Sequence, residues 1–144
     1  TASVGVIALV LPWVLAGDRY TAEIELAATV GTFEGLTPSA CANGKGYPKP
    51  FKGVYFVLPG NAPRLMVDTG EGDRPVRVRV ERAGREVAAL TGSERCATMT
   101  GAVTPNGITA HKVEGVDGTL DIACTLPDGK PLRIQGRFRN CFRP

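Results

Sequence analysis

The stretch PVRVRVERAGREVAAL, residues 75–90, decides the fold class of this chain. Every second residue over 76–80 is a valine, and charged residues stand between them. A strand over these positions would place all its valines on one face. An Ala-Gly turn at 83–84 follows, and a second strand returns from Val87 onward. The stretch therefore predicts a β-hairpin with one buried face.

Segments on the N-terminal side of this hairpin also predict strands. Ile24, Leu26 and Ala28 lie on one side of a predicted strand, and two strands at 54–58 and 64–67 flank a Pro-Gly-Asn-Ala-Pro turn. The 144 residues include 18 glycines and 11 prolines. So many breakers favour many short strands over a few long helices.

The last third of the chain predicts a four-stranded meander. Its strands run near 94–103, 107–116, 118–126 and 132–141, with Pro-Asn-Gly, Val-Asp-Gly and Pro-Asp-Gly turns between them. Asn-Gly and Asp-Gly are strong short-range signals for a hairpin. We therefore expect an all-β fold over residues 18–144: a single-domain antiparallel sandwich or barrel with a C-terminal β-meander and two disulfides.

The composition narrows the classes of function. Hydrophobic residues make up 43% and charged residues 22%, which is typical of a globular domain. A net charge of +3 and the scarcity of aromatic residues argue against a nucleic-acid partner. With one histidine and no Cys-x-x-Cys pair, we expect no metal site and no cofactor.

The four cysteines are interpreted as two disulfides, with buried free thiols as the alternative. An even number of dispersed cysteines in a small chain rich in Gly and Pro is typical of exported proteins. A regular final hairpin would separate Cys124 from Cys141 by about 25 Å, whereas the Cα atoms of a cystine lie within about 7 Å. The meander register then favours a Cys96–Cys141 pair, which leaves Cys41 for Cys124.

The N-terminal segment VGVIALVLPWVLAG, residues 4–17, is apolar throughout. It is short for a membrane span and matches the apolar region of a signal peptide in length. We predict that residues 1–17 form an export, anchor or docking segment. A buried core strand that ends at Pro12 is the alternative.

Two polar surfaces are candidate binding sites. The segment 35–53 has no periodicity and is predicted to be a long loop tied down by Cys41, with Lys45, Tyr47 and Lys49 as ligand contacts. An idle surface loop is the alternative.

Near the C-terminus, Arg133, Arg137 and Arg139 share one face of a predicted strand. Such a row of arginines would bind phosphate, sulfate or carboxylate polymers. An edge strand that charge protects from pairing with neighbours is the alternative.

Asp68, Thr69 and Gly70 form an Asp-Thr-Gly triplet after an apolar run, and these residue types are also common turn formers. The stretch VYFVLPGNAPRLMVDTG resembles the strands that lead into the active-site turn of retropepsins, and PLRIQGRF resembles a later segment of that family. The resemblance implies a homodimeric aspartic protease in which two Asp68 carboxylates share a proton. The chain departs from the family pattern at Glu71 and Gln135.

These observations together predict an exported, disulfide-stabilised β domain. It would act as a non-catalytic binding or structural module of the cell envelope or of a secreted assembly. Its expected partner is a protein or an anionic polymer, with a further membrane or assembly contact through residues 1–17. The alternative function is the retropepsin-like protease that uses Asp68.

Overall fold

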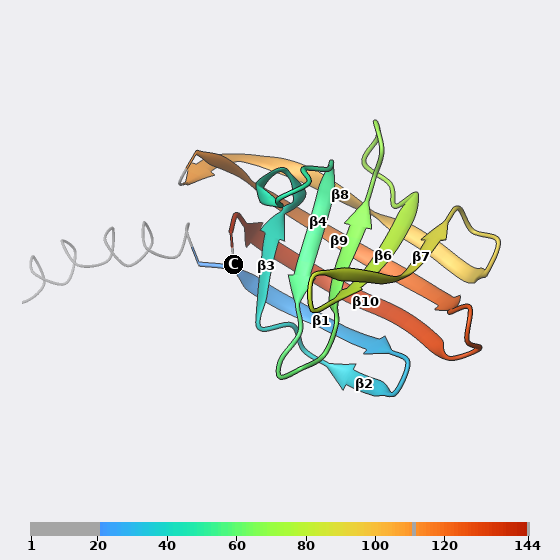
Figure 1. Ribbon diagram of the computed structural model, residues 1–144. Coiled ribbons are helices and arrows are strands. Elements are labelled where there is room, and N and C mark those ends of the chain that lie inside the picture. Colours follow the sequence, from blue (N-terminus) through green and yellow to red (C-terminus); the bar gives the residue numbers. More distant parts are fainter. Residues whose placement is uncertain (1–20, 111, 144) are drawn as a thin grey trace, which may run out of the picture.

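The structure is a computed structural model that describes residues 21–110 and 112–143. The predicted segment 1–17 lies outside the described residues. The described part of the chain forms two antiparallel sheets of five strands each, ordered β2-β1-β10-β9-β8 and β3-β4-β5-β6-β7. In Figure 1 the second sheet lies in front of the first, and the strands of the two sheets cross. This arrangement confirms the predicted all-β sandwich.

The strands follow the chain order closely. The first sheet comprises β1 (Glu23–Val30), β2 (Phe33–Leu36), β8 (Cys96–Ala110), β9 (Val113–Thr125) and β10 (Pro131–Cys141). The second sheet comprises β3 (Ala40–Asn43), β4 (Gly53–Val57), β5 (Arg64–Asp68), β6 (Arg77–Arg82) and β7 (Arg85–Thr91), and a short 3-10 helix, η1 (Gly44–Gly46), follows β3.

Alternating apolar side chains build the core between the sheets. Leu26 and Ala28 of β1 and Val78 and Val80 of β6 are buried, as the sequence pattern predicts. Val76 was predicted to point inward with them, but it precedes β6 and is 44% exposed, so that part of the prediction is wrong. The inward alternation begins only where the ladder with β5 begins, at the pair Asp68–Arg77.

The two sheets meet at a pair of phenylalanines. Phe56 of β4 and Phe138 of β10 are almost fully buried, and their ring centroids lie 5.4 Å apart in an edge-to-face arrangement. Because such rings bury a large apolar area each, this pair supplies much of the interior of a chain with few aromatics.

The central hairpins agree with the sequence. The predicted strands at 54–58 and 64–67 correspond to β4 and β5, and the predicted Ala83-Gly84 turn joins β6 to β7 with positive φ at both residues. The predicted loop at 35–53 is wrong in part, because it contains β3 and η1. β3 is only four residues long, so it is too short to show periodicity, yet it pairs in register with β4.

The C-terminal meander has three strands, β8, β9 and β10, where four were predicted. Asp117-Gly118 lies inside β9 rather than in a turn. A side chain at Gly118 would collide with the backbone of Ala102 and the ring of Phe138, so this glycine serves close packing. Pro105-Asn106-Gly107 lies inside β8, where the register with β9 shifts.

The two disulfides join Cys41 to Cys141 and Cys96 to Cys124. Both predicted pairings, Cys96–Cys141 and Cys41–Cys124, are therefore wrong. With one strand fewer in the meander, Cys96 lies directly opposite Cys124 across β8 and β9. The other bridge links β3 to β10 and so fastens the two sheets to each other.

A bulge in β10 turns Cys141 toward the core. Phe138 pairs with Gly118, and the next register pair is Cys141 with Val116, so β10 holds one residue more than β9 in this interval. Asn140 takes a positive φ of 57° at the bulge. Since side chains alternate along a regular strand, Cys141 would otherwise face away from the side of Phe138.

Candidate functional site

The Asp-Thr-Gly triplet forms the turn that follows β5. The Asp68 carboxylate accepts a hydrogen bond from the backbone N–H of Gly70 at 2.8 Å, and Gly70 has a positive φ of 59°. Thr69 is buried, and its hydroxyl donates to the carbonyl of Lys52 at 3.1 Å. Each of the three residues thus has a structural part in the turn.

Tyr47 lies on the outer face of the second sheet rather than at a free surface. It is 8% exposed, and its hydroxyl donates a hydrogen bond to Oε1 of Glu81 at 2.5 Å. Its ring packs edge-to-face on Tyr55, with centroids 5.0 Å apart. Burial, reinforced by the hydrogen bond to Glu81 and the nearby negative charge, raises the pKa of Tyr47 to about 12.

This tyrosine belongs to a second apolar cluster outside the main core. Ala42, Tyr55 and Met66 are buried with Tyr47, and Phe51 packs against them. The guanidinium of Arg79 lies 4.8 Å from the centroid of the Phe51 ring. The segment after η1 therefore covers the sheet with its aromatic side chains, while the predicted contacts Lys45 and Lys49 stay exposed around it.

Asn43 fixes the start of this covering segment. Its side-chain oxygen accepts from the N–H of Lys45, and its amide nitrogen donates to the carbonyl of Glu114 at 2.8 Å. Its backbone N–H donates to the carbonyl of Phe142 at 3.1 Å. This buried asparagine thus ties the end of β3 to β9 and to the C-terminal segment.

The arginine row lies on the outer face of β10, as the alternation predicts. Two guanidinium nitrogens of Arg137, Nη2 and Nε, lie 2.8 and 2.9 Å from the same carboxylate oxygen of Glu25, and Arg139 lies 3.7 Å from Glu23. Gln135 donates to Asp121 on the other side at 3.1 Å. The row is therefore flanked by acids of β1 and β9, and only Arg133 has no ion pair among the described residues.

The alternative interpretation of this row, a charged edge strand, is wrong. β10 lies in the middle of the first sheet, between β1 and β9. Arg77 and Arg79 do not extend the row, because they belong to β6 in the other sheet. There Arg77 lies 3.5 Å from Glu86.

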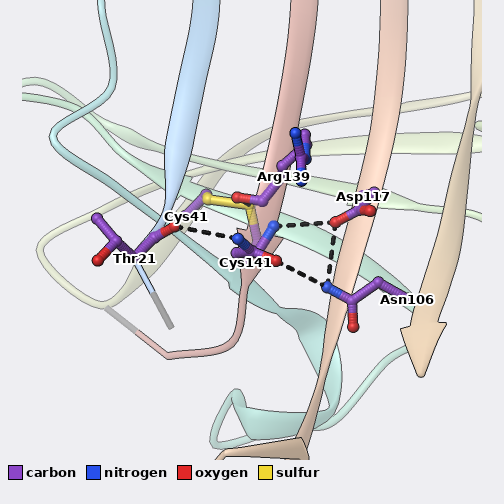
Figure 2. The surroundings of a disulfide bond; sticks show 7 residues. Thr21, Cys41, Asn106, Asp117, Arg139 and Cys141 are labelled. Atoms are coloured by element: carbon purple, nitrogen blue, oxygen red, sulfur yellow. Dashed lines mark hydrogen bonds between the residues drawn. A yellow bond between two sulfur atoms is a disulfide. The ribbon is translucent and has the colours of Figure 1, made fainter. Parts of the chain in front are cut away.

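A polar network surrounds the disulfide between the sheets (Figure 2). The backbone N–H of Asn140 donates to Oδ1 of Asp117 at 2.9 Å, and the Asn106 amide donates to the same oxygen at 3.2 Å. The Asn106 amide also donates to the Asn140 side-chain oxygen at 3.1 Å, and Asn140 donates to the carbonyl of Thr21 at 3.3 Å. Because these groups satisfy one another, the network stabilises the bulge that orients Cys141.

The structure contains a cavity that the sequence did not indicate. It measures about 310 Å³ and opens at one end of the sandwich, and we call it the end cavity. Its apolar lining includes Val30, Phe33, Val80, Val87 and Leu126, and its charged lining consists of Arg82, Asp128 and Lys130. A volume near 300 Å³ lies at the lower end of the range for small-molecule sites.

Sequence reasoning missed the end cavity because four separate hairpins contribute to it. These are the β1–β2 turn, the β6–β7 hairpin, the β9–β10 turn and, through Pro63, the β4–β5 connection. The one residue that marks the cavity by itself is Val87 of β7, an apolar residue that is 58% exposed in the structure. In the sequence it reads as an ordinary strand residue, since alternation alone cannot tell a cavity wall from a core position.

The comparisons place the chain in no known group. No protein-family model, no curated protein and no solved structure matches it. Within residues 21–110 and 112–143, no helix is long and apolar enough to cross a membrane. Over the same residues, no three His, Cys, Asp or Glu side chains are grouped so that they could hold a metal ion.

Proposed function

We propose that this chain is an exported β domain that acts by binding, without catalysis, in the cell envelope or in a secreted assembly. The observation that carries the proposal is the pair of disulfides, which includes every cysteine of the chain. Disulfides form and persist in oxidising compartments outside the cytoplasm. Its partner is a protein, an anionic polymer or a smaller anionic ligand, and residues 1–17 provide export or a further contact.

The geometry of the binding surfaces supports a rigid scaffold. The Cys41–Cys141 bridge fixes one sheet on the other, and the polar network holds the strand that carries Cys141. A preorganised body loses little conformational entropy when it binds, which favours affinity. Exposed Lys45 and Lys49 beside the covered aromatic cluster, and Arg133 on the first sheet, remain the candidate contacts for an anionic polymer.

The experiment that tests export compares the chain made in the periplasm and in the cytoplasm of a bacterial host. We expect peptide mass spectrometry under non-reducing conditions to find both cystines in the periplasmic material. We also expect the cytoplasmic, reduced material to unfold at a lower denaturant concentration. Equal stability of the reduced and oxidised forms would remove the argument for export.

The Asp68→Asn variant separates binding from proteolysis. Asn keeps an oxygen that accepts the Gly70 N–H, so the turn is expected to persist. We expect no peptidase activity that depends on Asp68 in an assay with a mixture of unfolded peptides at acidic pH. A hydrolysis that the wild type performs and the Asn variant lacks would establish the retropepsin-like alternative instead.

A further inference from the structure

We propose that the end cavity binds a small amphiphile that has an apolar chain and an anionic head group. This inference rests on the proposed binding function, because it names the ligand class of one site on that domain.

The walls of the end cavity are apolar and continuous with the core. Val30, Val80 and Leu126 are buried core residues that also line the cavity. Val87 lines it too, and with Val76 it is one of two large apolar side chains that are exposed in the described part of the chain. An apolar chain that filled the cavity would remove Val87 from water, which is favourable in proportion to the area buried.

The backbone around the end cavity is held in place. The N–H of Gly31 in the β1–β2 turn donates to the carbonyl of Pro131 at 2.8 Å, which links this turn to the start of β10. In the β9–β10 turn, Leu126 donates to Lys130 and Gly129 donates to Leu126, both at 2.8 Å. Two walls of the cavity are thus fixed to each other, so the site is preformed.

Two cations stand at the rim. The guanidinium of Arg82 lies 5.6 Å from the centroid of the Phe33 ring, which holds it against the apolar wall. Neither Arg82 nor Lys130 takes part in an ion pair among the described residues, whose ion pairs involve Arg77, Arg137 and Arg139. Both cations are therefore available to an anionic head group.

Among the described residues, Asp128 is the one acid that lines the cavity, and it already accepts a hydrogen bond. Oδ1 of Asp128 accepts a hydrogen bond from the backbone N–H of Lys130 at 2.9 Å. With two cations and one carboxylate, the rim carries an excess of positive charge. This charge selects an anionic amphiphile over a cationic one, while the apolar walls select an amphiphile over a free anion.

The test titrates the isotopically labelled, full-length oxidised chain with decanoate below its micelle-forming concentration and follows backbone amide shifts by NMR. We expect saturable shifts centred on Phe33, Val87 and Lys130. Decyl phosphate should produce the same pattern. Acetate and inorganic phosphate, which have a charge without a chain, and decyltrimethylammonium, which has the opposite charge, should not produce it.

Two variants with matched controls locate the site. Val87→Asp and Arg82→Glu should each weaken decanoate binding about tenfold, by loss of apolar contact and by reversal of charge. Val76→Asp changes the other exposed valine, and Arg74→Glu reverses the charge of an exposed arginine that does not line the cavity, so each should leave the affinity within about twofold.

Shifts that spread over the surface, or decanoate binding that the Val87 and Arg82 variants leave unchanged, would overturn the proposal. If decanol bound as tightly as decanoate, the proposed recognition of an anionic head group would be wrong. The proposed function fails separately, because the cystine mapping of the periplasmic protein does not depend on any amphiphile.

Discussion

At the scale of single residues, glycines allow close backbone approach between strands of the first sheet. Gly136 of β10 has a positive φ of 137°, and a Cβ atom there would lie 2.1 Å from the carbonyl oxygen of Glu25. Gly101 of β8 has a φ of 138° and a similar approach, 2.2 Å, to the carbonyl oxygen of Thr119. These strands therefore accept only glycine at these points.

We predict that Gly136→Ala lowers the free energy of unfolding by at least about 3 kcal/mol. The positive φ is strained for alanine, and the added Cβ atom collides with the carbonyl oxygen of Glu25. Urea denaturation measures the loss. Gly60→Ala is the control, since Gly60 also has a positive φ but open space around it, and it should cost about 1 kcal/mol. Equal losses of stability in the two variants would show that the neighbouring strand moves enough to remove the collision.

The raised pKa of Tyr47 predicts that the free energy of unfolding depends on pH in the alkaline range. Its pKa in the folded chain is about 12, above the ordinary value of 10.0, so the unfolded chain loses this proton first as pH rises. The contribution of Tyr47 is complete below pH 10.0 and is lost as pH rises toward 12. We expect the stability advantage of the wild type over Tyr47→Phe to shrink across this window, as measured by urea denaturation at several pH values. An advantage that stays constant would contradict the raised pKa.

At the scale of elements, the bulge of β10 depends on one carboxylate. Asp117→Ala would leave the backbone N–H of Asn140 without its acceptor in a residue that is 5% exposed. We predict a loss of about 2 kcal/mol in the free energy of unfolding. Asp121→Ala is the matched control on the same strand, because Asp121 is exposed and its carboxylate accepts only from Gln135 among the described residues, and it should cost less than about 0.5 kcal/mol. The opposite order would show that the network does not hold the bulge.

The sequence predicted the elements well where apolar and polar residues alternate along a strand, as in β1 and β6, and where turn residues separate two apolar runs, as in β4 and β5. It failed where Asx-Gly pairs serve packing instead of turning. Asp117-Gly118 packs under Phe138, and Asn106-Gly107 lies in a bulge, so neither reverses the chain. Because the prediction placed one strand too many in the meander, it assigned both disulfide pairings incorrectly. The bulge at Asn140 could not be foreseen, because it is stabilised by a hydrogen bond that the Asn140 N–H donates to Asp117 of a different strand, β9.

At the scale of the whole molecule, the cystines close loops of different length. Cys41 and Cys141 are 100 residues apart, and Cys96 and Cys124 are 28 apart. Loop-closure entropy assigns about 4.7 and about 3.6 kcal/mol to these bridges. We predict that the double variant Cys41→Ala with Cys141→Ala loses more stability in urea than Cys96→Ala with Cys124→Ala. The reverse order would show that strain or residual structure outweighs chain entropy.

The surfaces that act in binding belong to this largest scale as well. The predicted arginine row exists, but acids of β1 pair with two of its members, and these acids lie about 110 positions earlier in the chain. The end cavity likewise arises where four hairpins meet. The sequence near the arginines does not show that acids neutralise them, and the sequence near Val87 does not show that it lines a cavity. Both features depend on which strands the fold brings together.

The pairing of β1 with β10 has a consequence for how the protein is made. In the described chain β1 pairs with β2 and β10, and β10 is the tenth strand in chain order. β1 therefore cannot pair with β10 until the strands between them have been synthesised, and contacts so distant in sequence form slowly. The first sheet thus closes only after all five strands of the second sheet have left the ribosome.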